Sequence, residues 1–296
     1  MPQSLTHIVT VVLAKRDADL FSKALSLISQ PGSPTILSDN LAFEFQLEID
    51  HPKQAQADFL QMFDQQGIAA DICVQPNIGR KKKLLICDMD STLIGQECID
   101  ELADYAGMKD QVSAITERAM RGEIDFESAL KERVRLLKDL PISVLETCFE
   151  ARISLNSGAS TLARTMRANG ATTVIVSGGF TFFTQRIAAL AGFEHHHANQ
   201  LGTTDDHLTG EVIPPILGRA AKREQLEHYS RSRGGPAQAL AIGDGANDLA
   251  MIEIAGLGLA YHAKPAVAQA AQAAIEHTPL TTALYFQGYR EEEFVS

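Results

Sequence analysis

The stretch "LLICDMDSTLIGQECIDELA" at residues 84–103 places two carboxylates, Asp88 and Asp90, directly after a short apolar run. Such a run, ended by polar turn residues, is typical of a buried β-strand. Residues two apart in an extended chain point to the same side, so both carboxylates leave the strand together. Paired carboxylates there could attack an electrophile, transfer protons or bind a cation. Alone, the stretch is equally compatible with a solvated turn.

Two further apolar runs end in polar residues of the same character. "TTVIVSGG" ends at Ser177, Gly178 and Gly179, and "ALAIGDGAND" contains Asp244 and ends at Asp248. In an open α/β sheet, ligands bind beyond the carboxyl ends of the strands. Three polar strand ends of this kind therefore predict one functional site.

The acidic side chains of this predicted site need a positive partner. Four carboxylates in one pocket would repel one another strongly, and they are contributed by Asp88, Asp90, Asp244 and Asp248. An all-oxygen ligand set is typical of a hard cation, and it predicts Mg²⁺.

A phosphate group would fit beside these carboxylates. Ser177 and the backbone N–H groups of the glycines after it could bind phosphate oxygens. Lys222, near the start of a predicted helix in "GRAAKREQL", could supply the counter-charge, although in isolation it would be interpreted as a solvated helix lysine.

Composition restricts the class of protein. The chain has 296 residues, enough for two domains, with 45% hydrophobic and 21% charged residues, as in ordinary soluble proteins. Its net charge of −11 argues against nucleic-acid or anionic-membrane binding, and the basic run at 80–83 is expected to be a solvated hinge. No apolar run approaches a membrane span, and the N-terminus lacks the basic start and apolar run expected of a secretion signal. Four cysteines without C-x-x-C spacing predict reduced thiols in the cytoplasm.

The elements around the strand ends divide into two patterns. Residues 1–79 give the order β-α-β-β-α-β, in which "LAFEFQLEI" alternates as a half-buried antiparallel strand and Gly67 ends the second helix. From Lys83, strands alternate with helices, which predicts a parallel sheet. The predicted catalytic core comprises residues 80–94 and 156–296.

The insertion at residues 95–155 is predicted to be entirely helical. One apolar stripe contains Ile99 and Leu102, and a second helix begins after a predicted N-cap at Asp125. Ser143 and Glu146 have the S-x-x-E spacing of a capping box. An insertion of this length is expected to form a small helical domain of its own.

The polar motifs at the predicted strand ends, together with Lys222, resemble those of a known enzyme superfamily. "DMDST", "SGG", Lys222 and "GDGAND" resemble the four motifs of the haloacid dehalogenase superfamily, over about residues 84–280. The helical insertion resembles the cap of the phosphoserine phosphatases within that superfamily. The resemblance implies a Rossmann-like parallel-sheet core with a helical cap inserted after its first strand. It implies hydrolysis of O-phospho-L-serine to L-serine, with Mg²⁺ held by Asp88, the main-chain carbonyl of Asp90, and Asp244.

The resemblance also assigns roles to individual residues. Asp88 would be the nucleophile, and Asp90 the general acid and base, as its carboxyl group permits. In the cap, Glu97 would bind the substrate's ammonium group and Arg133 its carboxylate. The remaining expected contacts are Ser177, Gly178, Lys222 and Asn247 for phosphate and substrate, Asp248 and Gly179 behind them, and Met120 and Phe126 as an apolar lid.

The first 79 residues resemble the ACT-like domains attached to enzymes of amino-acid metabolism. The first strand–helix connection, "LAKRDADL", has no glycine to let a ligand approach the backbone closely. This absence argues against effector binding, so we expect a docking role, or a homodimer formed through this domain, at least as much as effector binding.

Other functions are also compatible with part of the sequence. The enzyme could act on another small phosphomonoester, such as phosphothreonine. A signalling receiver domain also accepts phosphate on an aspartate, but it would lack the helical insertion and Asp90. "EHHHA" at 194–198 could bind a transition metal, yet adjacent residues of an extended segment do not face one ion.

Overall fold

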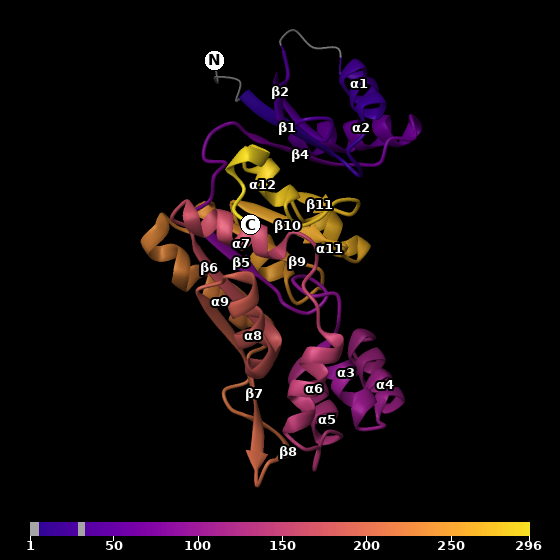
Figure 1. The fold of residues 1–296 in the computed structure, drawn as a ribbon, viewed down its shortest axis with the longest axis vertical. Coiled ribbons are helices and arrows are strands. Elements are labelled where there is room, and N and C mark those ends of the chain that lie inside the picture. The colour runs from indigo at the N-terminus through magenta and orange to yellow at the C-terminus, as the bar shows by residue number, and fades with distance from the viewer. Residues whose placement is uncertain (1–5, 29–32) are drawn as a thin grey trace.

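A computed structural model of the chain describes residues 6–28 and 33–296, and for Met120 only the backbone. It contains a four-stranded sheet near the N-terminus, a seven-stranded sheet in the middle and a group of helices beside the second sheet (Figure 1). The predicted α/β fold, with a mostly parallel core sheet and a preceding α+β unit, is confirmed.

The N-terminal sheet has the strand order β2-β3-β1-β4, with β1 antiparallel to both of its neighbours. Its elements are β1 (Thr6–Leu13), α1 (Ala18–Leu27), β2 (Thr35–Ser38), β3 (Ala42–Glu48), α2 (Pro52–Gln65) and β4 (Ala70–Pro76). The helices bury Val9, Phe43 and Phe63 against one face of the sheet. Gly67 follows α2 with φ of 67°, a left-handed conformation that glycine adopts freely, as predicted for a helix end.

Part of the second face of this sheet is buried as well. Val12, Ala42 and Cys73 join the apolar core of the second sheet, and α12 (Thr282–Phe286) lies beneath β1 (Figure 1). The predicted half-buried antiparallel strand at β3 is nevertheless confirmed, because Phe43 and Phe45 are buried while Gln46 and Glu48 are exposed. The second face of β3 is covered at its start, at Ala42.

The basic run after β4 is part of this contact. Arg80 forms an ion pair with Glu44 at 2.5 Å, with both side chains largely buried. Lys82 donates from Nζ to the carbonyl oxygens of Gly79 and Ala237. The expected solvated hinge was wrong for these two residues, because Glu44 and Ala237, which are distant in the sequence, supply acceptors to them.

The core sheet has the order β11-β10-β9-β5-β6-β7-β8. Its strands are β5 (Leu84–Cys87), β6 (Thr172–Phe180), β7 (His195–Thr204), β8 (His207–Ile213), β9 (Ala239–Gly243), β10 (Leu257–Tyr261) and β11 (Ala273–Ile275). All neighbours are parallel except β7 and β8. The sequence did not predict β7, β8 or β11, since the first two are polar and the third is very short.

Helices cover both faces of the core sheet. On one side lie α7 (Ala159–Ala168), α8 (Thr181–Ala191) and α12, and on the other α9 (Arg219–Ser230), α10 (Leu249–Ile252) and α11 (Pro265–Ala270). Leu85 and Cys87 face the first group, and Leu84 and Ile86 the second, as strand alternation requires. No helix among the described residues has the length and apolar character needed to cross a bilayer.

The insertion consists of α3 (Cys98–Tyr105), α4 (Lys109–Met120), α5 (Phe126–Arg135) and α6 (Ser143–Arg152). Its regular elements are therefore helices, as predicted. Asp125 caps α5 by accepting from Ser128 N at 2.9 Å. The predicted capping box at Ser143 was wrong. Ser143 is the first residue of α6 and makes no cap, because Glu146 instead pairs with Arg186 of α8 at 2.5 Å.

The β7–β8 hairpin extends alongside the insertion (Figure 1). Leu208 N donates to Leu140 O, and Asp139 N donates to Leu208 O, both at 2.9 Å. Ile142 N donates to Asp206 O at 2.8 Å. The hairpin thus braces the connection between α5 and α6.

Asp71 joins the two sheets and provides a test of their docking. Its buried carboxylate accepts from the backbone N–H groups of Glu276 and His277 and from the Thr278 hydroxyl. We expect Asp71→Ala to lower the free energy of unfolding by about 2–4 kcal/mol, because buried donors lose their acceptor. Urea denaturation followed by circular dichroism measures this loss.

Asp64→Ala is the matched control, since Asp64 is exposed on α2 of the same unit. It should change the free energy of unfolding by less than about 0.5 kcal/mol. Equal stability of the two variants would contradict the proposed anchoring by Asp71.

Candidate active site

The strand ends that carry polar residues meet at one edge of the core sheet. Strands β9, β5 and β6 are adjacent and parallel. Asp244 and Asp88 directly follow β9 and β5, and Ser177 lies in the last part of β6. They line a cavity of about 650 Å³. The same cavity is lined from the core by Asp90, Gly178, Gly179 and Asn247, and from the insertion by Glu97, Phe126 and Arg133. Lys222 lines a small adjoining cavity together with Ser177, Gly178 and Asn247.

Lys222 lies between two buried carboxylates. Its Nζ is 2.7 Å from Asp88 Oδ2 and 2.5 Å from Asp248 Oδ1, and the three side chains are at most 7% exposed. Burial opposes the charged amine, but Asp248 and Asp88 outweigh it and raise the pKa of Lys222. Burial, and then the charge of Asp248, raise the pKa of Asp88, while Lys222 opposes that shift.

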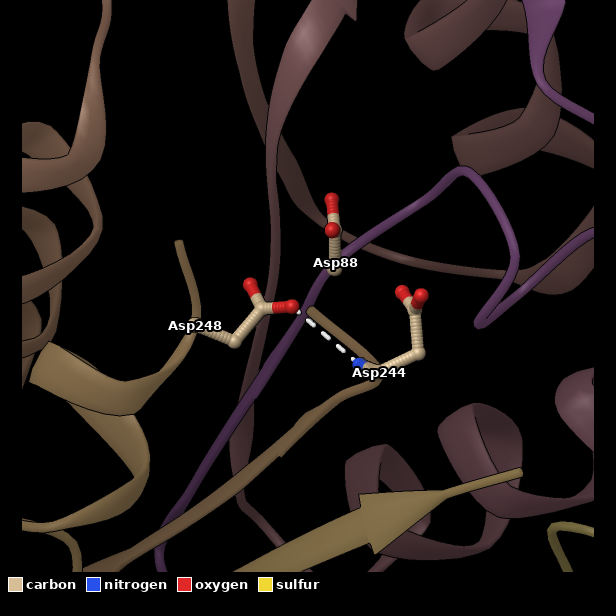
Figure 2. A group of neighbouring side chains, drawn as sticks. All are labelled: Asp88, Asp244 and Asp248. Atoms are coloured by element: carbon tan, nitrogen blue, oxygen red, sulfur yellow. Dashed lines mark hydrogen bonds between the residues drawn. The ribbon is translucent and has the colours of Figure 1, made fainter. Parts of the chain in front are cut away.

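Asp248 also holds the loop that follows β9. Its Oδ2 accepts from Asp244 N at 3.1 Å (Figure 2) and from Gly245 N at 3.0 Å. A Cβ at Gly243 would lie 2.3 Å from Asp248 Cγ, so only glycine permits this approach. Asp248 therefore connects the position of Lys222 to the position of Asp244.

The carboxylates of Asp88, Asp244 and Asp248 could hold a metal ion. Each offers an oxygen, and these oxygens lie within 4.8 Å of one another (Figure 2). Burial and the charge of Asp248 raise the pKa of Asp244 to about 6, as expected where carboxylates crowd together without a cation. The oxygen donors and the excess negative charge fit a hard divalent cation.

Asp90 is fixed by both of its oxygens. Oδ1 accepts from Cys98 N at 2.8 Å, and Oδ2 accepts from Ser177 Oγ at 3.1 Å. Gly179 N donates to Ser177 Oγ, and a Cβ at Gly179 would lie 2.7 Å from Asp90 Oδ2. Burial raises the pKa of Asp90, although the hydrogen bonds from Cys98 and Ser177 lower it. A carboxyl group with a raised pKa is suited to donating a proton.

Phe126 brings the insertion into contact with the core. A Cβ at Gly178 would be 3.0 Å from Phe126 Cζ, and one at Gly218 would be 3.5 Å from Phe126 Cδ1. The aromatic ring thus covers the last part of β6 and the start of α9, and the sequence predicts an apolar lid at this residue. The side chain of Met120, the other predicted lid residue, lies outside what the structure describes.

Glu97 and Arg133 provide opposite charges in the insertion's part of the cavity. Glu97 Oε1 accepts from Ser91 Oγ at 2.7 Å. Glu97 keeps exposed surface, although surrounding protein atoms partly desolvate its carboxylate. This burial, followed by the charge of Asp90, raises the pKa of Glu97 to about 7. Arg133 donates from Nε to Ala129 O at 3.3 Å and from Nη1 to Thr116 Oγ1 at 3.4 Å.

The cavity also contains polar residues that the sequence analysis missed, namely Asp100, Thr116, Arg219 and Lys264. Asp100 follows Glu97 by three residues, a spacing that places two side chains on one helix face. This spacing could have predicted that Asp100 lines the same cavity as Glu97. Lys264 follows β10, the next strand in the sheet, whose end carries no motif that the sequence analysis recognised.

The three adjacent histidines lie apart from this site. On β7, His197 Nε2 is 2.9 Å from Tyr229 Oη, whereas His196 Nδ1 is 3.0 Å from Thr184 Oγ1. Alternation along the strand thus turns them to different partners, as expected. The four cysteines are free and buried.

Residues 85–253, more than half of the chain, match the family model of haloacid dehalogenase-like hydrolases. The chain belongs to this family. A curated relative, the phosphoserine phosphatase of Archaeoglobus fulgidus, is 41% identical over 238 residues, which cover 79% of this chain and 69% of the relative.

Solved structures of this family extend the likeness to most of the chain. A HAD-family hydrolase from Salmonella enterica serovar Typhi aligns with a TM-score of 0.83 and 29% identity over 95% of this chain and 98% of its own. A structure described as a phospho-aspartyl intermediate analogue of phosphoserine phosphatase aligns with a TM-score of 0.64 and 39% identity. That alignment covers 69% of this chain and 98% of the other.

The charge balance around Lys222 predicts a large effect of its removal. Lys222→Ala would leave Asp88 and Asp248 buried without a cation, so we expect the free energy of unfolding to fall by about 3–5 kcal/mol. Urea denaturation in EDTA measures the change. Lys131→Ala removes an exposed pair with Glu127 and should cost less than about 0.5 kcal/mol. A loss no larger than this control would contradict the charge assignment.

Because the pKa of Glu97 is raised, replacing its carboxylate with a neutral group is expected to stabilise the fold at high pH but not at low pH. A carboxyl group with a folded-state pKa of about 7, against 4.5 as its ordinary value, destabilises the fold once it ionises. This cost is absent below pH 4.5 and complete above pH 7. Glu97→Gln should therefore raise the melting temperature of the metal-free protein at pH 8, and by much less at pH 5.

Thermal unfolding in EDTA between pH 5 and pH 8 tests this expectation. Glu150→Gln, at an exposed position on α6, should give no such trend. A difference between Glu97→Gln and wild type that stays constant with pH would contradict the interpretation.

Proposed function

We propose that the protein is a Mg²⁺-dependent phosphatase that hydrolyses O-phospho-L-serine to L-serine and phosphate, the last step of serine biosynthesis. The observation that carries this proposal is one cavity with two kinds of wall. The core contributes Asp88, Asp90 and Ser177, which suit phosphoryl transfer, and the insertion contributes Glu97 and Arg133, which suit an amino acid. The similarity to proteins named phosphoserine phosphatase supports the same substrate.

In the first step, a carboxylate oxygen of Asp88 attacks phosphorus while the bond to the serine oxygen breaks. Asp90 donates its proton to that leaving oxygen, so free serine departs. The product on the enzyme is an aspartyl-phosphate at Asp88. The raised pKa of Asp90 and its fixed orientation suit this donation.

In the second step, Asp90, now ionised, removes a proton from water. The resulting oxygen attacks phosphorus and displaces the Asp88 carboxylate, which releases inorganic phosphate. Asp90 regains its proton and both residues return to their starting states. One residue can perform both proton transfers because the leaving group and the water occupy the same side in turn.

Mg²⁺ would be held by the Asp88 and Asp244 carboxylates and the main-chain carbonyl of Asp90. When bound, it offsets the repulsion between the anionic nucleophile and the phosphate. Asp248 orients Lys222, since its oxygens are engaged by that amine and by two backbone amides. The phosphate oxygens would be bound by Ser177, Gly178, Lys222 and Asn247, with Gly179 behind them.

The insertion would select the substrate. The Glu97 carboxylate would bind the ammonium group, and the Arg133 guanidinium would bind the carboxylate with parallel hydrogen bonds. Phe126 and Met120 would close the cavity against water. We therefore interpret residues 95–155 as a specificity cap on a core made of 80–94 and 156–296.

The role of residues 1–79 is a second part of the proposal. We retain docking, and a homodimer formed through this unit, as its expected roles. Part of one face of the N-terminal sheet is buried against α12, which supports docking of this unit onto the core. Its edge strand β2 would pair with a partner in the homodimer. Four buried, free cysteines support a cytoplasmic setting.

The test is phosphate release from O-phospho-L-serine with Mg²⁺, compared with phosphothreonine, p-nitrophenyl phosphate and an EDTA control. We expect preference for phosphoserine, loss of activity in EDTA, and a fall in kcat of about 10³-fold or more for Asp88→Asn, which removes the nucleophile. Hydrolysis of the aryl ester without phosphoserine would contradict the proposed role of the insertion. Preference for phosphothreonine would favour the alternative substrate.

A further inference from the structure

Asp100 lies in the first turn of α3, three residues after Glu97, and lines the same cavity as Arg133. Glu101, the next residue, faces away from the cavity and pairs with Arg152 at 2.9 Å. The two neighbouring carboxylates thus have different environments, one in the cavity and one on the outer side of the insertion.

The Asp100 carboxylate lacks a partner for a buried oxygen. Its Oδ1 is buried and accepts no hydrogen bond from the described residues. Most buried polar atoms in folded proteins are satisfied, so an unpaired oxygen inside a ligand cavity indicates a contact completed when the site is in use.

Arg133 is held loosely in the same part of the cavity. Its bonds to Ala129 O and Thr116 Oγ1 are long, at 3.3 and 3.4 Å, and use Nε and Nη1. A guanidinium carries five N–H donors, so donors remain for a carboxylate on each side. Within the described structure, Asp100 and Arg133 do not come within ion-pair distance.

Asp100 and Arg133 nevertheless have the strongest electrostatic influence on each other among opposite charges. Burial raises the pKa of Asp100, and Arg133 is the strongest influence against that rise. Burial lowers the pKa of Arg133, and Asp100 is the strongest influence against that fall. Glu97, in contrast, is influenced first by burial and then by Asp90. Asp100 therefore belongs electrostatically with Arg133.

We propose that Asp100 is a positioning residue that holds the Arg133 guanidinium charged and oriented, so that its remaining donors receive the substrate's carboxylate. This inference rests on the proposed function, because it assumes an α-carboxylate at Arg133. Asp100 itself touches neither the phosphate nor the reacting atoms. It determines how well the enzyme distinguishes phosphate esters that carry a carboxylate from those that do not.

The test compares Asp100→Asn with wild type on four phosphate esters. O-phospho-L-serine carries both charged groups, phosphoethanolamine only the ammonium, phosphoglycolate only the carboxylate, and p-nitrophenyl phosphate neither. An ester that turns over slowly is measured as a competitive inhibitor. We expect KM or Ki to rise about 3- to 10-fold for phosphoserine and phosphoglycolate, the size of one ordinary net hydrogen bond, because Arg133 itself remains in place. Values for the other two esters should change less than about twofold, and kcat on phosphoserine should be largely retained.

Two further variants separate positioning from a structural role. Glu101→Gln alters the adjacent carboxylate outside the cavity and should leave all four values unchanged. In an Arg133→Lys background, Asp100→Asn should cost less than about twofold, because the residue that it positions is already altered. Melting temperatures verify that each variant is folded.

Equal losses on all four esters would overturn the proposal in favour of a structural role. Losses confined to phosphoserine and phosphoethanolamine would overturn it in favour of ammonium binding. Unchanged discrimination would also overturn it. A wild-type enzyme that does not favour phosphoserine over the aryl ester would overturn the proposed function itself, which the Asp100 variants alone cannot do.

Discussion

The site depends on one buried cation, Lys222, shared between Asp88 and Asp248. Two carboxylates could not remain buried and close together without it, because their repulsion and their lost hydration would both destabilise the fold. Asp248 transmits this constraint to the loop after β9 through the N–H groups of Asp244 and Gly245. The predicted nucleophile, the counter-charge and the predicted metal ligand are thus positioned by one charge-balanced cluster.

The fold separates chemistry from recognition. Three adjacent parallel strands bring the residues proposed for phosphoryl transfer to one edge of the sheet, and the helical insertion adds the groups proposed to bind an amino acid. Phe126 packs on the end of β6 and the start of α9, and the β7–β8 hairpin forms hydrogen bonds with the connection between α5 and α6. Changes in the insertion can therefore alter substrate preference while the cluster around Lys222 stays intact.

Much of this arrangement could be predicted from the sequence, because strand ends are marked by abrupt changes from apolar to polar residues. Asp88, Ser177 and Asp244 were grouped on that basis, and the structure brings them together. Features that depend on distant segments could not be predicted. The burial of Arg80 and Lys82 requires acceptors far along the chain, and Glu146 pairs with Arg186 instead of capping α6. Asp100 was missed because an unpaired oxygen becomes visible only when its surroundings are known.

The central claim is that Asp88 carries the phosphoryl group during turnover, and mass spectrometry of the acid-quenched enzyme tests it most directly. The enzyme would be mixed with O-phospho-L-serine and Mg²⁺ and quenched within milliseconds, with the Asp90→Asn variant in parallel. The account predicts one added phosphoryl group on the peptide that contains Asp88, labile to hydroxylamine as an acyl phosphate should be. Phosphate on a different residue, or catalytic turnover without any phosphorylated enzyme, would contradict it.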